Sequence, residues 1–383
     1  MPEERCGAAA LGRHAERAHA VLSPSAAHRW LRCPASVKLV ERLRGEGRIE
    51  EATSAAAAEG TAAHEVAELV LTRYLQNRLL QPWEIDSWWQ RHHDVLPEVT
   101  ASQGWYRIYT EITPYLEVVK DLDESGWTIM LERRVNPGND SCTGTADCVA
   151  LSPDGRELKV IDLKFGRGVP VSAGGNPQLR LYALGALRLF EALGSIETVT
   201  MMIVQPRLDS ISQDSMPASD LQDWYRWVVE PVVAETASPE ARFGPGEKAC
   251  RWCPAAGMCT AQQRWVLADG FDADAETLSP EELADGLSRM TAIKNWMSAA
   301  KLTATRMLDL DPTAVPGWGL KPGVKRRKIV GYPPPDAPAD WVNPPTWKGL
   351  TELERANGKA EVADVLGDAI TITEGEPRLV RTK

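Results

Sequence analysis

The chain has 383 residues, of which 43% are hydrophobic and 25% charged, a composition typical of a globular protein with a buried core. Its formal net charge of −10 excludes a protein that coats nucleic acid by bulk electrostatics, although a local basic groove is compatible with that charge. No apolar run approaches the roughly 20 residues of a membrane span, so we expect no membrane association and a cytoplasmic location.

The first part of the chain predicts helices separated by irregular segments. Ser23 and Pro24 suit the N-cap and first turn of one helix, and an alanine-rich stretch with apolar residues at helical spacing predicts a second, which carries His64. The first residues have mixed charge and no long apolar stretch, so we expect no secretory signal there. The predicted segments are a flexible extension over 1–21, helices over 23–43 and 55–75, an irregular tryptophan-rich segment over 82–114, and the end of another helix over 115–122.

The middle of the chain changes from helical to strand periodicity. A turn signature, Ser-Pro-Asp-Gly, begins at Ser152 and predicts a hairpin. The predicted elements are strands over 127–135, 145–151, 158–163 and 197–204, a turn at 152–157, and a helix over 177–193. A meander followed by a helix and a strand predicts an α/β fold with a mixed central sheet flanked by helices.

The last part of the chain predicts a helical extension and a small separate unit. Ser279 and Glu282 form a capping box that opens a long amphipathic helix. The predicted segments are a helix over 220–235, a cysteine-bearing loop over 243–259, a core ending at 262, a helical extension with a basic segment over 277–332, a proline-rich linker over 333–345, and a tail unit over 346–383. The basic segment is either a solvated turn or a phosphate contact, and it contains Lys321, Lys325, Arg326, Arg327 and Lys328.

Asp147, Asp162 and Lys164 form a candidate catalytic constellation. Asp162 and Lys164 are two residues apart near the end of a predicted strand, so they share a face, and an antiparallel neighbour can bring Asp147 beside them. Carboxylates bind the hard cations Mg²⁺ and Mn²⁺, which polarise a phosphate and activate water, while a lysine neutralises developing charge. The backbone carbonyl of Leu163 is a further candidate ligand, and Glu132 either supplies another carboxylate or pairs with a neighbouring arginine at the surface. Taken alone, the D-x-K pattern is also compatible with the polar face of an exposed strand.

Four short motifs occur in the order typical of one nuclease family. They are a helix segment from Glu59 to Glu65 that contains His64, Gly144-x-x-Asp147, Asp162-x-Lys164 and Gln178-x-x-x-Tyr182. Through these motifs, residues 22–262 resemble the RecB-like branch of the PD-(D/E)xK nuclease superfamily, which includes the CRISPR-associated RecB-like exonucleases. The segment 277–383 is similar to an uncharacterised phage-associated family of this branch.

The resemblance implies a restriction-endonuclease-like core with defined site residues. It assigns metal binding to His64, Asp147 and Asp162, action on the attacking water to Lys164, and ordering of the site and the DNA backbone to Gln178 and Tyr182. Without it, a satisfied helix histidine is the favoured interpretation of His64, and Gln178 and Tyr182, one helical turn apart, are compatible with ordinary helix packing.

The cysteines indicate a second metal centre. Seven cysteines, an odd number, argue against a disulfide framework. Cys250, Cys253 and Cys259 form a C-x2-C-x5-C loop, and remote Cys33 would complete four thiolates, which suit either zinc or an iron–sulfur cluster. The family resemblance, whose amino-terminal cysteine motif Cys33 matches, implies a [4Fe–4S] cluster that staples the two ends of the core, with structural Zn²⁺ as the alternative. The other cysteines are expected to be free thiols, namely Cys6, Cys142 and Cys148.

These features predict a metal-dependent phosphodiesterase that acts on DNA, an exonuclease or end-processing enzyme more than an endonuclease, in phage or bacterial recombination or replication. Its expected partners are DNA, single-stranded or with free ends, and a recombination or replication protein. The alternatives are a catalytically inactive DNA-binding or scaffold module that keeps the fold and cluster, and a zinc-stapled protein-interaction factor. The intact acidic and lysine set favours the enzyme.

Overall fold

The computed structural model divides the chain into two compact units, Met1–Ala292 and Ile293–Lys383. It describes residues 20–49, 54–98, 100–190, 196–267, 280–322, 325–329, 342–343, 346–374 and 378–381. Several predicted features fall wholly or largely outside these residues: the extension over 1–21, Cys6, Ser279 and the linker over 333–345. No described helix combines the length and the apolar character that crossing a membrane requires.

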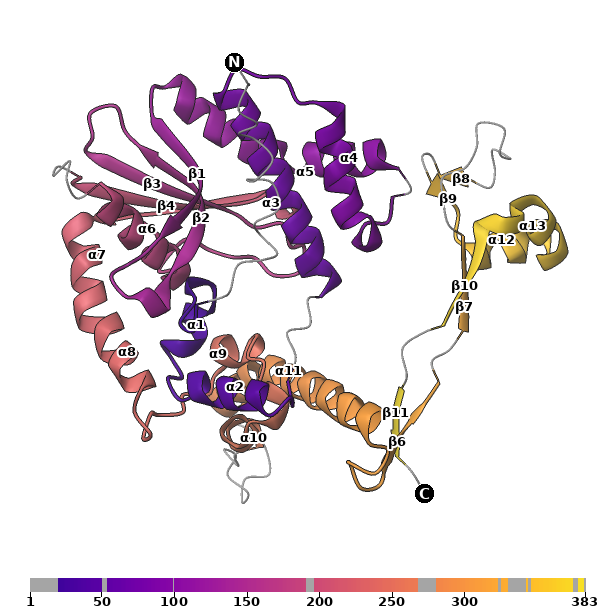
Figure 1. The fold of residues 1–383 in the computed structure, drawn as a ribbon. Coiled ribbons are helices and arrows are strands. Elements are labelled where there is room, and N and C mark those ends of the chain that lie inside the picture. The colour runs from indigo at the N-terminus through magenta and orange to yellow at the C-terminus, as the bar shows by residue number, and fades with distance from the viewer. Residues whose placement is uncertain are drawn as a thin grey trace, which may run out of the picture. The chain divides into compact units, whose positions relative to one another are not determined.

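A five-stranded mixed sheet forms the centre of the first unit (Figure 1). Its strands lie side by side in chain order: β1 (Thr128–Val135), β2 (Gly144–Leu151), β3 (Glu157–Leu163), β4 (Thr198–Gln205) and β5 (Ser210–Pro217). Neighbouring strands are antiparallel except β3 and β4, which are parallel and connected through helix α6 (Pro177–Leu189). The four predicted strands and the turn at 152–157 are confirmed. Strand β5 was not predicted, because its sequence SISQDSMP is mostly polar.

Helices cover both faces of this sheet (Figure 1). The core on one face contains residues of α3 (Ala55–Leu75), α4 (Pro82–His92) and α5 (Ala101–Glu124), and the core on the other contains residues of α6, α7 (Ala218–Trp224) and α8 (Glu230–Thr236). Consecutive strand residues alternate between the two cores, as Val160 and Ile161 do on β3. The expected mixed α/β architecture is therefore confirmed.

The prediction of an irregular segment over 82–114 was wrong. Helix α4 begins with a capping box in which Gln81 and Glu84 bond reciprocally, and α5 begins where Thr100 accepts a hydrogen bond from the Gln103 N–H. Tryptophans at Trp88 and Trp105 hide the helical period in the sequence. In the fold they are buried and meet edge to face, with ring centroids 5.4 Å apart.

The single helix predicted over 23–43 was also wrong, because the chain breaks before Cys33. It forms η1 (Pro24–Ala26), α1 (Ala27–Trp30) and α2 (Ser36–Gly45). Pro34 lacks a backbone N–H and disfavours helical geometry at the residue before it. The break therefore places Cys33 outside a helix, beside the later cysteine loop.

The remaining elements complete the two units. The predicted helix over 220–235 is confirmed, with a π-helical turn, Tyr225–Val229, between α7 and α8. The other elements are η2 (His93–Val95), η3 (Asp140–Cys142), η5 (Pro206–Leu208), α9 (Glu247–Arg251), η7 (Ala256–Met258), α10 (Thr260–Leu267), α11 (Pro280–Leu310), β6 (Trp318–Lys321), β7 (Lys325–Ile329), β8 (Val342–Asn343), β9 (Thr346–Trp347), α12 (Leu350–Asn357), α13 (Lys359–Leu366), η9 (Gly367–Ala369), β10 (Ile370–Glu374) and β11 (Arg378–Arg381). The second unit has its own small core, formed by Leu353, Val362 and Leu366.

Candidate active site

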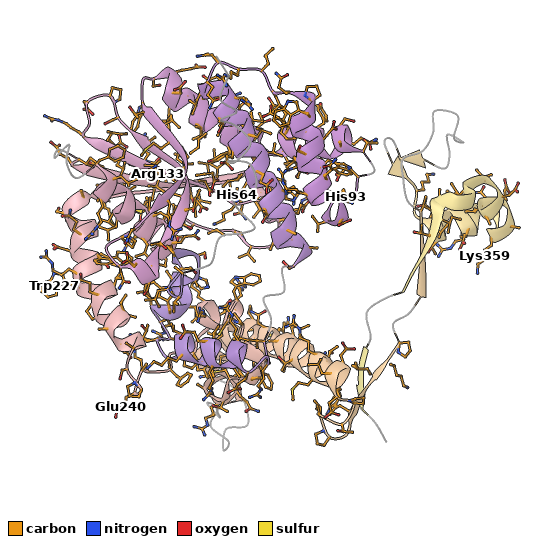
Figure 2. All side chains as sticks on the ribbon, in the orientation of Figure 1. His64, His93, Arg133, Trp227, Glu240 and Lys359 are labelled. Carbon is orange, nitrogen blue, oxygen red and sulfur yellow. The ribbon has the colours of Figure 1, made fainter. Side chains whose placement is uncertain are left out.

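One pocket of about 420 Å³ gathers most of the residues singled out in the sequence. Helix α3 contributes His64, which Figure 2 labels beside the strands. Strands β1, β2 and β3 and helix α6 supply the rest. The predicted residues that line the pocket are His64, Glu132, Asp147, Asp162, Lys164, Gln178 and Tyr182.

The two aspartates meet where strands β2 and β3 separate. Their ladder is regular as far as Cys148 opposite Ile161. One residue further on, the Oδ2 atom of Asp147 accepts a hydrogen bond from the backbone N–H of Leu163 at 2.8 Å. This bond fixes Asp147 against β3, while the Leu163 side chain is buried in the core beneath α3 and α5. Leu163 thus contributes its backbone to the site.

Asp162, Lys164, Gln178 and Tyr182 form a connected polar chain. The Nζ atom of Lys164 lies 2.8 Å from Asp162 Oδ2 and donates to Gln178 Oε1 at 3.4 Å. The amide nitrogen of Gln178 lies 3.2 Å from both Asp162 Oδ1 and the Tyr182 hydroxyl. Gln178 is held in the first turn of α6, because the Asn176 side chain caps that helix and accepts from the Gln178 N–H. Gln178 therefore contacts both Asp162 and Lys164, and Tyr182 contacts Gln178, while the site roles of this pair stay a prediction.

A second grouping in the pocket joins His64, Glu132 and Asp147. His64 Nδ1 lies 3.3 Å from Asp147 Oδ1. Ligand atoms of these three residues lie within 4.8 Å of one another, and within the described part of the chain no other three His, Cys, Asp or Glu residues meet that criterion. Asp162 is outside the grouping. Glu132 lines the pocket, as Arg134 does, and its role as a further carboxylate of the site stays a prediction.

Negative charge dominates the electrostatics of the site. Burial raises the pKa of Asp162, and the neighbouring Asp147 adds to that rise against the opposing effect of Lys164. Burial also acts to raise the pKa of Asp147, but His64, Lys164 and the Leu163 N–H bring it below its usual value. Burial acts to lower the pKa of His64 and of Lys164, yet the carboxylates raise both overall. A site whose carboxylates raise the pKa of its basic groups favours added positive charge.

The donor set fits a divalent cation. Asp162 is 2% exposed, and its Oδ2 atom accepts no hydrogen bond of acceptable geometry, although Lys164 is close. Burying a carboxylate oxygen that accepts no hydrogen bond costs free energy, unless a further partner such as a cation contacts it. Carboxylate oxygens with one imidazole are ligands that Mn²⁺ and Mg²⁺ accept.

A half-buried ion network that the sequence did not suggest holds α3 over the sheet. Arg207, in η5 after β4, pairs with Glu59 of α3 at 2.7 Å and with Glu111 of α5 at 2.6 Å. Arg107 of α5 also pairs with Glu59, at 3.0 Å. Glu59 precedes His64 by five residues on α3, so the network fixes the helix that carries the histidine.

The pocket also contains polar side chains that sequence reasoning missed, among them Ser25, Thr61 and Arg134. Arg134 Nη2 donates to Thr143 Oγ1 at 3.2 Å, which keeps a cation at the rim. The sequence could have indicated Arg134, because it lies two residues after Glu132 on a strand and such residues share a face.

The four cysteines of the second predicted centre line one small cavity of about 20 Å³, which Arg29 also lines. Backbone contacts hold its distant parts together, with Ala35 N–H bonded to the Arg242 carbonyl at 3.2 Å. Burial raises the pKa of the Cys253 thiol to about 11, against the lowering effect of Arg29. Arg29 is itself buried, donates to the Ser36 carbonyl and hydroxyl, and makes no salt bridge with a described carboxylate.

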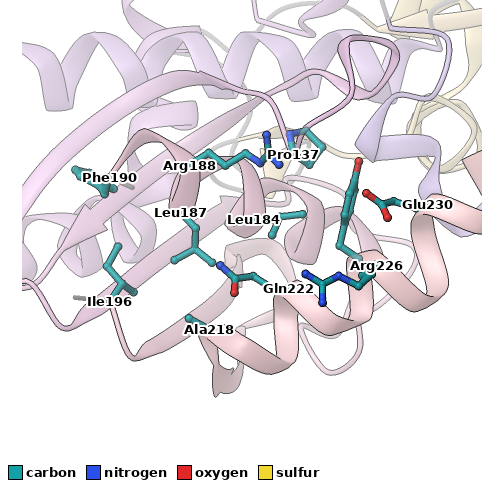
Figure 3. A pocket seen from close by; sticks show the side chains of 11 residues that line it. Pro137, Leu184, Leu187, Arg188, Phe190, Ile196, Ala218, Gln222, Arg226 and Glu230 are labelled. Carbon is teal, nitrogen blue, oxygen red and sulfur yellow. The ribbon is translucent and has the colours of Figure 1, made fainter. Parts of the chain in front are cut away.

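A further pocket of about 480 Å³ lies between α6 and the α7–α8 segment (Figure 3). Leu184, Leu187 and Phe190 form part of its wall, and Arg188, Arg226 and Glu230 supply its charged side chains. It contains a single carboxylate, so it lacks the paired acids of the first pocket.

Comparison with known proteins identifies the family. Residues 19–383 match the model of a family described as "Protein of unknown function (DUF2800)". This chain belongs to the DUF2800 family. Among solved structures, the DUF2800 chain is similar to "Crystal structure of SSO0001", with 18% identity over 42% of this chain and 74% of that one and a TM-score of 0.22.

Proposed function

We propose that this protein is a metal-dependent nuclease that hydrolyses phosphodiester bonds in DNA. The observation that carries the proposal is the convergence of His64, Asp147, Asp162 and Lys164 in one pocket, although they come from three separate elements. Burying a charged side chain without a partner costs free energy. Two carboxylates, a lysine and a histidine that happened to lie on polar surfaces would therefore not gather at partly buried positions.

Each residue has a role that follows from its contacts. His64, Asp147 and Asp162 would hold a divalent cation, which when bound polarises the phosphate and activates water for attack. Lys164, fixed by Asp162 and Gln178, places a positive charge where charge develops on the phosphate oxygens. Gln178 orients the Asp162 carboxylate through its amide nitrogen, and Tyr182 restrains that amide.

The fold is consistent with a restriction-endonuclease-like core of the RecB-like kind. A mixed sheet with helices on both faces places Asp147 and Asp162 on adjacent antiparallel strands, and Gln178 at the start of the helix that follows. This is the arrangement that the ordered motifs imply. It supports the assignment together with the intact set of site residues.

We propose in addition that Cys33, Cys250, Cys253 and Cys259 hold a [4Fe–4S] cluster. A buried guanidinium among four thiols calls for a negative partner, which metal thiolates supply. Four thiolates on one zinc ion at about 2.3 Å would place their sulfurs roughly 3.8 Å apart. The four thiols line one cavity but do not form a group with ligand atoms within 4.8 Å among the described residues. That wider spacing favours a cluster over a zinc ion.

The decisive experiment follows end-labelled single- and double-stranded DNA with protein purified without oxygen, with Mg²⁺ or Mn²⁺ or with chelator. We expect metal-dependent loss of DNA with the wild type and none with Asp162→Ala. The matched control is Asp223→Ala, which removes an exposed carboxylate on α7. The position of the label gives the polarity, and circular DNA separates end-dependent from internal cutting.

If neither the wild type nor Asp162→Ala degrades DNA and both still bind it, the protein is a DNA-binding or scaffold module.

We propose linear or single-stranded DNA as the substrate and a recombination or replication protein as the partner. A reducing cytoplasmic setting suits the described cysteines, all of which are free thiols in the structure.

A further inference from the structure

Glu132 has a backbone conformation that is unusual for its residue type and position. It lies in the middle of strand β1 with φ of +45°. The other described non-glycine residues with positive φ are Asn77, which follows α3, and Asp209, which ends η5. Asn and Asp tolerate left-handed geometry at such ends, whereas a glutamate within a strand has no local reason to adopt it.

The distortion lies directly opposite a candidate metal ligand. In the ladder between β1 and β2, Leu131 pairs with Cys148 and Arg133 pairs with Ala146. Between these two pairs, Glu132 lies opposite Asp147. That intervening pair is missing from an otherwise continuous ladder. The strain is therefore located at the point where β1 reaches the pocket.

The strained backbone brings the Glu132 carboxylate toward His64 and Asp147. The ligand atoms of the three residues lie within 4.8 Å of one another, a spacing that suits a single ion. An extended backbone at Glu132 would suffice for a surface ion pair with a neighbouring arginine. Strain at a functional site persists when the surrounding structure and the bound group compensate for it.

We propose that Glu132 is a ligand of the divalent cation and that its left-handed backbone is the device that delivers the carboxylate. The cation then lies on the side of the pocket that His64, Glu132 and Asp147 share, and Asp162 faces it from the Lys164 and Gln178 side. This inference rests on the proposed function only in identifying the cation as the one used for DNA hydrolysis.

The test compares two substitutions that remove the same charge but treat the backbone differently. Glu132→Gln keeps the side-chain size and the strain, and Glu132→Gly relieves the strain because glycine adopts positive φ freely. The matched pair is Arg133→Gln and Arg133→Gly, at the exposed neighbour on the same strand, where φ is ordinary. Mn²⁺ binding is measured by calorimetry and by electron paramagnetic resonance, and Tm is measured with chelator.

Both Glu132 variants should bind Mn²⁺ at least about tenfold more weakly than the wild type, and both Arg133 variants should bind it normally. In chelator, Glu132→Gly should melt above Glu132→Gln by roughly 2–4 °C. Arg133→Gly should melt below Arg133→Gln, because glycine weakens an ordinary strand position.

If Glu132→Gln binds Mn²⁺ normally, the ligand role of Glu132 is overturned. If Glu132→Gly melts below Glu132→Gln, the order expected for the two Arg133 variants, the role of strain is overturned. These outcomes differ from failure of the proposed function. If the wild type binds Mn²⁺ through Glu132 but cuts no DNA, the cation site stands and the nuclease assignment falls. If DNA is cut and Glu132→Gln binds Mn²⁺ normally, only the present inference falls.

Discussion

The ring of Tyr182 packs so tightly on Gly144 that a Cβ atom at Gly144 would lie 2.6 Å from Tyr182 Cε1. That contact explains why glycine begins β2, three residues before Asp147. It also fixes the tyrosine whose hydroxyl restrains Gln178.

Gly144→Ala should therefore displace Tyr182 and loosen the chain from Gln178 to Asp162. We expect DNA hydrolysis to fall at least about tenfold, because a small misplacement of positioning residues is costly to turnover. Secondary structure by circular dichroism should be unchanged. Gly168→Ala is the control, since a Cβ atom there meets nothing within 4 Å, and its activity should match the wild type. Full activity of Gly144→Ala would show that the tyrosine contact is not needed.

Lys164→Met should separate catalysis from metal binding. The side chain keeps its length but loses the charge that lies 2.8 Å from Asp162. We expect kcat to fall by roughly 10²–10³-fold, the cost typical of removing one electrostatic donor from a site. Mn²⁺ affinity should be retained or increased, because a competing cation has gone. Lys159→Met, on the strand that Lys164 directly follows, serves as the control. A Lys164 variant that loses Mn²⁺ affinity while it keeps its kcat would contradict the assigned role.

The cysteine cavity predicts a link between cluster content and stability. Cys33→Ser should lose iron and visible absorption and should lower Tm, because the proposed cluster would join segments separated by more than 200 residues of sequence. Gly244→Ala should lose iron without removing a thiol, since its Cβ atom would lie 2.0 Å from the Arg32 carbonyl oxygen. Cys142→Ser, at a buried thiol remote from the cavity, should keep its iron. Zinc in place of iron in protein purified without oxygen would identify the alternative centre.

Acid should weaken the attachment of α3 through Glu59. The hydrogen bond from Arg207 is the main cause that lowers the pKa of Glu59 in the folded protein. A lowered folded pKa stabilises the fold above the unfolded value of about 4.3, and the contribution is lost as pH falls through the folded value. Tm should therefore fall below about pH 5 in the wild type and less steeply in Glu59→Gln. The exposed Glu240, labelled in Figure 2, provides Glu240→Gln as the control, whose pH profile should follow the wild type.

Sequence reasoning located the strands that carry the site but misjudged two helical segments. Strand period and a turn signature are local properties, and so the bounds of β1 to β4 and the turn at 152–157 could be predicted. The break before Cys33 follows from Pro34, which is a local signal in the sequence. Helix α4 and the first part of α5 were missed, whereas the helix end predicted over 115–122 is confirmed as the end of α5. Only tertiary packing shows that Trp88 and Trp105 are core residues.

The sequence by itself determined which side chains carry the candidate chemistry, because the spacing of Asp162 and Lys164 on a strand, and of Gln178 and Tyr182 on a helix, places each pair on one face. Only the tertiary structure decided how those pairs meet. Long-range packing brings Asp147 onto the Leu163 N–H, His64 onto Asp147, and Arg207 onto Glu59. The tertiary structure also decided the conformation of Glu132. A positive φ within a strand persists only when the surrounding structure holds it, so it could not be predicted from the neighbouring residues in sequence.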